Sequence, residues 1–244
     1  MNTSFQVGGV TYNADQNGIV TESYTPGFFT TGDNKWYYAD ARGRLVTGAQ
    51  TINGQNLYFR EDGQQVKGDF GLNADGSRSY YHGETGDKLV STFFTTGNNV
   101  WYYADASGKV VTGPQVINGQ NLYFREDGQQ VKGGFATNAN GSRSYYHGDS
   151  GERLVSTFFT TGNNDWYYAD ANGQVVTGEQ VINGQRLYFD QTGKQVKGQK
   201  VTNTDGTISY FDPNTGDKMV NRWVSLPNGR RVYFNAQGKA YAAF

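Results

Sequence analysis

The stretch WYYADARGRLVTGAQTINGQNLYFREDGQQVKGDFGLNADGSRSYYHGETGDKLVSTFFTTGNNV, residues 36–100, decides the fold because the chain repeats it. It returns almost letter for letter at 101–165 and begins a third time at Trp166. Its landmarks are spaced by 65 residues, with WYYADA at 36, 101 and 166, INGQ at 52, 117 and 182, and QVKG at 65, 130 and 195. A period held this strictly indicates a repeat architecture.

Inside this period a pair of aromatic residues returns every 21 or 22 residues. The pairs begin at Tyr37, Tyr58, Tyr80, Tyr102, Tyr123, Tyr145, Tyr167, Tyr188 and Tyr210, with a lone Tyr12 before them and Tyr233-Phe234 after them. Each pair is followed by a glycine-containing turn and a short apolar run, which is typical of a β-hairpin. We therefore expect an all-β, elongated β-solenoid of about eleven stacked β-hairpins. Each repeat holds three of them, named A (WYY), B (LYF) and C (SYY).

The repeats predict one continuous solenoid domain with atypical ends. Residues 1–35 form a partial N-terminal repeat, because Phe28–Gly32 matches the FFTTG at 93 and 158. Residues 36–100 and 101–165 are complete repeats, 166–220 a degenerate third repeat and 221–244 a C-terminal capping hairpin, since terminal repeats are often atypical. The N-terminal segment looks like the end of an earlier repeat, so we expect a piece of a longer protein.

Composition predicts a thin aromatic core and excludes several functions. Val, Leu, Ile and Phe supply only 48 of 244 residues, whereas 18 Tyr and 4 Trp add apolar area. Each hairpin is then expected to bury its face only against its neighbours. A net charge of −1 and a pI near 6.1 argue against nucleic acid, and no segment suits a membrane. The absence of cysteine excludes disulfides and cysteine-ligated metals.

Strand alternation divides the residues of each hairpin between two faces. The apolar central positions, such as Val66, Tyr58 and Tyr80, are expected inside. Gln65 and Lys67 then share the outer face about 7 Å apart. An amide and an ammonium in such a pair suit vicinal hydroxyls, although a solvated strand face is the alternative. The pairs are Gln65/Lys67, Gln130/Lys132 and Gln195/Lys197.

Aromatic rings are also expected on this outer face. Alternation places there the last ring of each hairpin C, Tyr81, Tyr146 and Phe211, and the last ring of each hairpin A, Tyr38, Tyr103 and Tyr168. A flat ring beside hydrogen-bonding groups is what a pyranose needs. Packing between hairpins is the alternative for each ring.

The sequence predicts no catalytic residue, metal site or cofactor. His82 and His147 have no second histidine or cysteine nearby, so we expect solvated turn residues. The carboxylates Glu61-Asp62 and Glu126-Asp127 occupy hairpin turns of successive repeats, whereas a glycosidase needs two carboxylates flanking one cleft. No nucleophile motif or phosphate-binding loop is visible.

The pattern WYYAD…G…VTG…Q…ING…LYF…G…QVKG, residues 36–68, resembles the glucan-binding repeats of glucansucrases from lactic acid bacteria, the dextransucrase-like enzymes. Related cell wall-binding repeats occur in choline-binding proteins. The resemblance covers essentially the whole chain. It implies a secreted, extracellular or cell-surface, monomeric module that binds α-glucan polysaccharide or isomalto-oligosaccharides beside a parent catalytic domain. It also implies that the Gln-x-Lys pairs bind sugar hydroxyls and that a ring stacks a glucosyl unit.

Two alternatives and one departure follow from the same comparison. A choline-type wall anchor needs a cage of several aromatics, but Ala49, Pro114 and Glu179 stand where such repeats carry tryptophan. A spacer without ligand is the second alternative. The third repeat has Phe211 for Tyr, Asp212 for His and Lys200 for Phe, so we expect weaker binding there.

Overall fold

The computed structural model describes residues 3–7, 10–97, 100–163, 165–226 and 228–241, and in these ranges every regular element is a β-strand. The first strands are β1 (Thr3–Val7), β2 (Val10–Ala14), β3 (Val20–Tyr24), β4 (Gly27–Thr30), β5 (Trp36–Ala39), β6 (Gly48–Ile52), β7 (Gln55–Phe59), β8 (Asp69–Leu72), β9 (Arg78–Tyr81), β10 (Thr92–Thr95), β11 (Trp101–Ala104) and β12 (Gly113–Ile117). They are followed by β13 (Gln120–Phe124), β14 (Gly134–Thr137), β15 (Arg143–Tyr146), β16 (Thr157–Thr160), β17 (Trp166–Ala169), β18 (Gly178–Ile182), β19 (Gln185–Phe189), β20 (Lys200–Thr202), β21 (Ile208–Tyr210), β22 (Arg222–Ser225) and β23 (Arg231–Phe234).

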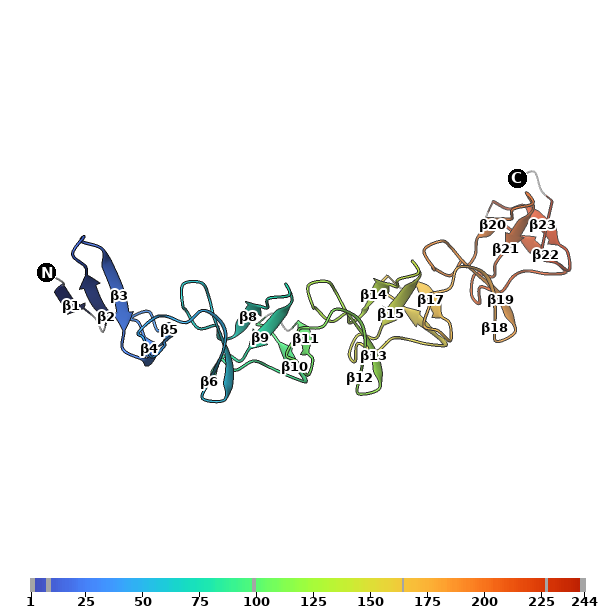
Figure 1. Ribbon diagram of the computed structural model, residues 1–244. Helices are drawn as coiled ribbons and strands as arrows, with labels where there is room; N and C mark the ends of the chain where they lie inside the picture. Colours follow the sequence, from blue (N-terminus) through green and yellow to red (C-terminus); the bar gives the residue numbers. More distant parts are fainter. Residues whose placement is uncertain (1–2, 8–9, 98–99, 164, 227, 242–244) are drawn as a thin grey trace. The chain divides into compact units, whose positions relative to one another are not determined.

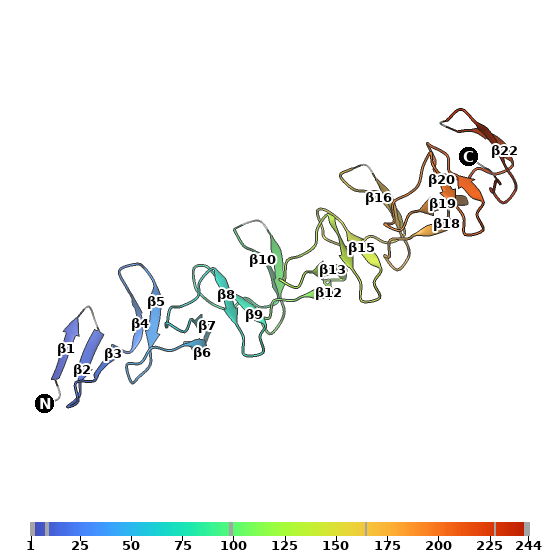
Figure 2. The ribbon, with the colours of Figure 1, turned by 90° about the horizontal axis from the view of Figure 1, so that it is seen from above.

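These strands form eleven small sheets in the described part of the chain. Strands β1, β2 and β3 form one three-stranded sheet, and each later sheet is a hairpin of two consecutive strands. Strands β8 and β9 lie side by side in Figures 1 and 2 and pair antiparallel, with Phe70 opposite Tyr80. The prediction of an all-β fold built from eleven hairpin units is confirmed. No helix long enough to cross a membrane occurs among the described residues.

The predicted pairing of each aromatic strand with the run after it is confirmed for Tyr12, whose strand β2 pairs with β3. In hairpins A, B and C it was wrong, because the aromatic strand pairs with the strand before it. In hairpin B, β6 pairs with β7 from Gly48↔Phe59 to Ile52↔Gln55. The turn between them is Asn53-Gly54, both with positive φ, which matches the twist of a hairpin. The run after the aromatic strand meets it only through the isolated bridge Phe59↔Gln65. Gly68, at φ +63°, then redirects the chain.

The chain contains two compact units, residues 1–115 with 124–130, and residues 116–123 with 131–244. Each unit holds a line of stacked rings. In the first, Phe94 lies between Tyr80 and Tyr102, at centroid distances of 4.5 and 5.3 Å. In the second, Phe159 lies between Tyr145 and Tyr167 at the same distances. These rings form the thin aromatic core that the composition predicts.

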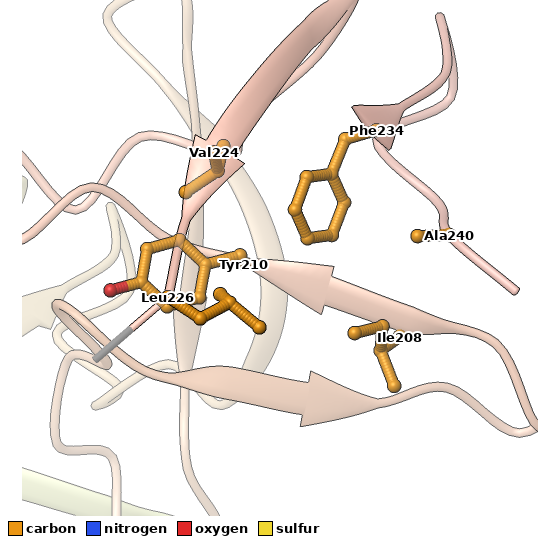
Figure 3. Packing of buried hydrophobic residues seen from close by; sticks show 6 residues of the cluster. All are labelled: Ile208, Tyr210, Val224, Leu226, Phe234 and Ala240. Atoms are coloured by element: carbon orange, nitrogen blue, oxygen red, sulfur yellow. The ribbon is translucent and has the colours of Figure 1, made fainter. Parts of the chain in front are cut away.

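The last buried cluster of the second unit packs the hairpins β20–β21 and β22–β23 against each other. Phe234 and Val224 point towards Tyr210, and Ala240 lies beside Ile208 (Figure 3). Ile208 and Ala240 also form an isolated antiparallel bridge. Residues after the final strand therefore contribute to this core.

The predicted inside positions are confirmed for the central rings Tyr102 and Tyr167 of hairpin A and for Val66 and Val131 of hairpin B, which are buried. In hairpins B and C the flanking rings, such as Phe59 and Tyr81, are the most buried, whereas the central rings Tyr58 and Tyr80 are half-buried. Both faces of these short hairpins are covered by neighbouring turns and hairpins, so alternation does not separate core from solvent.

Burial of Tyr81 is expected to make the stability of the fold fall with rising pH in the alkaline range. Burial raises the pKa of Tyr81 to about 12, above its ordinary value of 10, and the neighbouring Tyr58 adds to this shift. The folded state therefore keeps a proton that the unfolded chain loses, and the free energy of unfolding falls as the pH rises from 10 towards 12. Urea unfolding at pH 8, 10 and 11 measures this decline.

The variant Tyr81→Phe is the control for that decline, because the third repeat carries Phe211 at this buried position. Its stability is expected to fall less steeply with pH than that of the parent chain. An unchanged slope in this variant would show that Tyr81 does not cause the decline.

Candidate functional site

The Gln-x-Lys pair of the first repeat lies under the turn of hairpin C. Gly86 belongs to this turn and has φ +73°, and a Cβ there would overlap Nε2 of Gln65 and lie 3.2 Å from Cγ of Lys67. The turn at residues 82–87 therefore packs directly on both side chains. Gln65 is only 5% exposed, so the prediction that it lies on the outer face was wrong. The covering turn is the reason.

Lys67 connects this turn to an exposed tryptophan. Its Nζ donates a hydrogen bond to the backbone oxygen of Glu84 at 3.0 Å and lies 4.7 Å from the centroid of the Trp36 ring. An ammonium at this distance from an indole is held by a cation–π interaction. Trp36 is 38% exposed, and its carbonyl accepts a hydrogen bond from the backbone N–H of Gln65 at 2.7 Å. We call Trp36, Gln65, Lys67 and residues 82–87 site 1.

The turn of site 1 is fixed from within by His82. Its Nδ1 accepts hydrogen bonds from the backbone N–H groups of Glu84 at 3.3 Å and Thr85 at 3.4 Å. This interaction holds the Glu84 carbonyl where Lys67 meets it. The ring is exposed and serves the turn, which confirms the prediction of a turn residue.

The third repeat repeats this arrangement, with Trp166, Gln195, Lys197 and residues 212–217 as site 3. Lys197 Nζ donates to the carbonyl of Asn214 at 3.3 Å and lies 5.3 Å from the Trp166 ring centroid. The backbone N–H of Gln195 donates to the Trp166 carbonyl at 2.7 Å. Nε2 of Gln195 donates to the carbonyl of Thr215 at 3.4 Å. Site 3 is thus assembled as site 1 is.

Asp212 takes the place of histidine in site 3 without altering the turn. Its Oδ1 accepts hydrogen bonds from the backbone N–H groups of Asn214 and Thr215, both at 2.8 Å. These bonds lower the pKa of Asp212. The other two replacements lie elsewhere, with Phe211 in the core and Lys200 exposed at the start of β20. None of the three removes the tryptophan, the amide or the ammonium.

The second repeat shows the same local contacts within each unit. In the first unit, the backbone N–H of Gln130 donates to the Trp101 carbonyl at 2.8 Å. In the second unit, Lys132 Nζ donates to the Asp149 carbonyl at 2.9 Å, and His147 caps the turn as His82 does.

The rings predicted to stack a sugar are placed differently. The last rings of hairpin C lie in the core, with Tyr81 only 1% exposed. Tyr81, Tyr146 and Phe211 pack on Tyr58, Tyr123 and Tyr188, respectively, at centroid distances of 5.6 to 5.8 Å. Their predicted outer-face position was therefore wrong. The last rings of hairpin A, Tyr38, Tyr103 and Tyr168, are half-buried. The centroid of each lies 4.8 Å from that of a phenylalanine ring in the same hairpin.

Sequence reasoning missed the tryptophan. Alternation puts Trp36 on the same strand face as Tyr38, opposite Tyr37, so the signal was present. The structure brings Trp36 together with Gln65 and Lys67 and leaves part of the indole open to solvent. Site 1 therefore combines an apolar ring, a cationic donor, an amide and peptide carbonyls. Such groups can bind a neutral, hydroxyl-rich molecule with an apolar face.

The comparisons with known proteins agree with this architecture. The choline-binding repeat family matches residues 46–93, 111–158 and 176–223, and a cell wall binding repeat matches 27–45, 91–110 and 156–174. The chain belongs to the choline-binding repeat family. The crystal structure of choline binding protein F from Streptococcus pneumoniae is 20% identical, with a TM-score of 0.63 over 99% of each chain. It shows the same fold, a solenoid of choline-binding repeats.

Similar curated proteins are streptococcal enzymes. Glucosyltransferase-S of Streptococcus mutans is 43% identical over 213 residues, which cover 87% of this chain and 14% of that protein. Glucosyltransferase-I of the same organism is 45% identical over 194 residues, 80% of this chain and 13% of that protein. These matches confirm the resemblance to glucansucrase repeats. This chain spans only about a seventh of the length of these relatives.

Proposed function

We propose that this chain is a non-catalytic carbohydrate-binding module that binds dextran-like α-glucan through repeated sites. One observation carries the proposal. Sites 1 and 3 each bring a partly exposed tryptophan, a lysine and a glutamine against a turn with backbone carbonyls. The matching regions of streptococcal glucosyltransferases support glucan as the ligand.

The groups of site 1 suit one glucosyl unit. The open part of the Trp36 indole packs against the C–H face of the sugar ring, as aromatic side chains do in carbohydrate sites. Lys67 has three N–H donors and directs one at Glu84, so it can also serve a sugar hydroxyl. Gln65 lies beneath and holds the lysine and the turn in position. Tyr38 stays a candidate for a further ring contact.

Sites 1 and 3 are expected to bind glucan equally well. The sequence suggested a weaker third site, but Asp212 caps its turn as His82 does, and Phe211 lies in the core. Trp166, Gln195 and Lys197 keep the contacts of their counterparts. Binding of one polymer by several weak sites raises the overall affinity through effective concentration.

Such a module would act outside the cell, as a monomer, next to a parent glucansucrase. It would hold growing glucan near that enzyme or anchor the enzyme to a glucan matrix. The repeats supply the binding and the parent catalytic domain the chemistry. The division into repeats at residues 36, 101 and 166 sets the number of sites.

A choline-type wall anchor is disfavoured by the charge at the indole. A quaternary ammonium is bound by a cage of several aromatic faces. At Trp36 and Trp166 a lysine ammonium of the chain already lies against the ring, and it would repel a second cation. The spacer alternative gives no reason for the partly exposed tryptophans, because polar residues at these positions would expose less apolar surface to water.

Native gel electrophoresis with and without dextran in the gel tests the proposal. Dextran is expected to retard this chain strongly, with little effect of salt, because the ligand is uncharged. Tryptophan fluorescence should change on titration with isomalto-oligosaccharides, and a choline resin should not retain the chain. Mobility unchanged by dextran and by other α-glucans would contradict the proposal, and retention on choline resin would favour the wall anchor.

A further inference from the structure

A cleft of about 580 Å³ opens in the second unit, apart from the tryptophan sites. It lies between the β14–β15 turn, the segment after β17 with the start of β18, and the turn after β19. Its walls are residues 141–143, Asp170, residues 174–177, Gln180, Gln191 and Thr192. None of these residues belongs to site 3, and all belong to one compact unit.

The lining of this cleft is polar and electrically balanced. Two contacts hold the guanidinium of Arg143 in place. It lies 4.3 Å from the Phe135 ring centroid and donates a hydrogen bond to the carbonyl of Thr192. Asp170 faces the cleft as the opposite charge, and its Oδ1 accepts backbone N–H bonds from Asn172 and Gln174. The remaining polar groups are amides and hydroxyls, which both donate and accept hydrogen bonds.

The same place in the preceding repeat is charged. Positions 65 residues earlier replace the neutral residues by charged ones: Asp75 for Asn140, Lys109 for Gln174, Glu126 for Gln191 and Asp127 for Thr192. The arginine and aspartate are kept, as Arg78 and Asp105. Three of these positions line the cleft and Asn140 lies next to it in sequence, so the lining carries fewer charges here than at the matching place in the preceding repeat.

The charged version joins the two turns that the cleft separates. Lys109 Nζ lies 3.4 Å from Asp75 Oδ2 in the first unit, and Lys239 Nζ lies 2.6 Å from Asp205 Oδ2 at the last turn. The first ion pair connects the β8–β9 turn with the turn after β11, and the second connects the β20–β21 turn with the turn after β23. Asn140 and Gln174 have no charge, so no ion pair can connect their turns, and the space between them stays open.

We propose that this cleft is a second type of carbohydrate site, which binds one or two neutral sugar units mainly through their hydroxyl groups. Its volume lies in the range of small-ligand sites. The charges of Arg143 and Asp170 cancel, which disfavours an anionic or cationic ligand, and the amides and hydroxyls match a polyhydroxylated one. The choice of glucose as the sugar rests on the function proposed above.

The test uses the full chain with the tryptophan sites weakened by Lys67→Ala, Lys132→Ala and Lys197→Ala. Titration with isomaltotriose is followed by ¹H–¹⁵N NMR. We expect amide shifts at residues 141–143 and 174–177. Adding Asn140→Asp and Gln174→Lys installs the ion pair found in the other repeats. It should weaken this residual binding about tenfold and leave folding intact.

A control variant, Ala236→Asp and Gln237→Lys, adds the same two charges at an exposed turn outside the cleft and should leave the residual binding unchanged. If the triple lysine variant binds no isomaltotriose while the parent chain does, the cleft is not a sugar site and the tryptophan sites stand. Residual binding that survives Asn140→Asp/Gln174→Lys would also overturn the inference. If the parent chain itself binds no isomaltotriose, the function proposed for the tryptophan sites fails first.

Discussion

Replacement of Lys67, Lys132 and Lys197 together by alanine is expected to weaken dextran binding by at least about 100-fold, because avidity is lost when every site is weakened. Lys67 loses both its hydrogen bond to the turn and its position against Trp36. The sugar then loses a donor at the edge of the indole. Retardation in native gels of graded dextran content measures this effect.

The matched control removes three other cationic side chains, Lys35, Arg44 and Arg60. Each lies at the surface and is paired with an aspartate, so its loss changes net charge equally but costs little stability. This control should bind dextran like the parent chain. Equal retardation of both triple variants would contradict the role of the Gln-x-Lys lysines. Lys67→Ala and Lys197→Ala, made singly, are expected to weaken binding to similar extents.

Phe189→Ala is expected to lower the free energy of unfolding by about 3–5 kcal/mol, the usual cost of deleting a buried ring. Phe189 is 0% exposed at the end of β19 and packs with Ile182, Leu187 and the half-buried Tyr168. Because each hairpin contributes only a few core residues, few neighbouring side chains can move into the cavity that the substitution leaves. Urea unfolding, together with hydrogen exchange of the amides of β19, measures the loss and locates it.

Val181→Ala is the control on the same hairpin. Val181 is 72% exposed, so its truncation should change stability by no more than about 0.5 kcal/mol. Because each hairpin touches mainly its neighbours, the damage from Phe189→Ala should be greatest in the second unit. A loss below about 1 kcal/mol for Phe189→Ala would show that the aromatic clusters do not carry the stability of the stack.

The sequence predicts the repeat, the all-β class and the number of hairpins, because these follow from a period visible in the letters. It does not predict strand pairing. Gln65 lies close enough in sequence to bridge Phe59, yet the longer ladder forms on the other side, between β6 and β7. The Asn53-Gly54 turn decides this, because both residues take the positive φ that a two-residue hairpin turn requires. Asn-Gly is the sequence signal of such a turn, and the prediction based on the aromatic pairs did not use it.

The candidate site could be predicted in part. The residue types of Gln65 and Lys67 identify the pair, but their burial depends on a turn some twenty residues further along, which packs on them through Gly86. Alternation assumes one solvated face and fails when both faces are covered, as for Tyr81. Asp212 at the position that matches His82 looked like a loss of function, but each side chain accepts hydrogen bonds from the backbone N–H groups two and three residues further along.

Site 1 draws its parts from three successive hairpins, with Trp36 from the first, Lys67 after the second and the covering turn from the third. The stretch of sequence that forms one site therefore need not begin and end at the boundaries between repeats. Recombination between two copies of the gene segment, in register at the 65-residue period, would rejoin the halves of two sites into one complete site wherever the crossover falls. Repeats can in this way be gained or lost by unequal exchange, so that the number of proposed sites changes in whole steps while every remaining site stays intact.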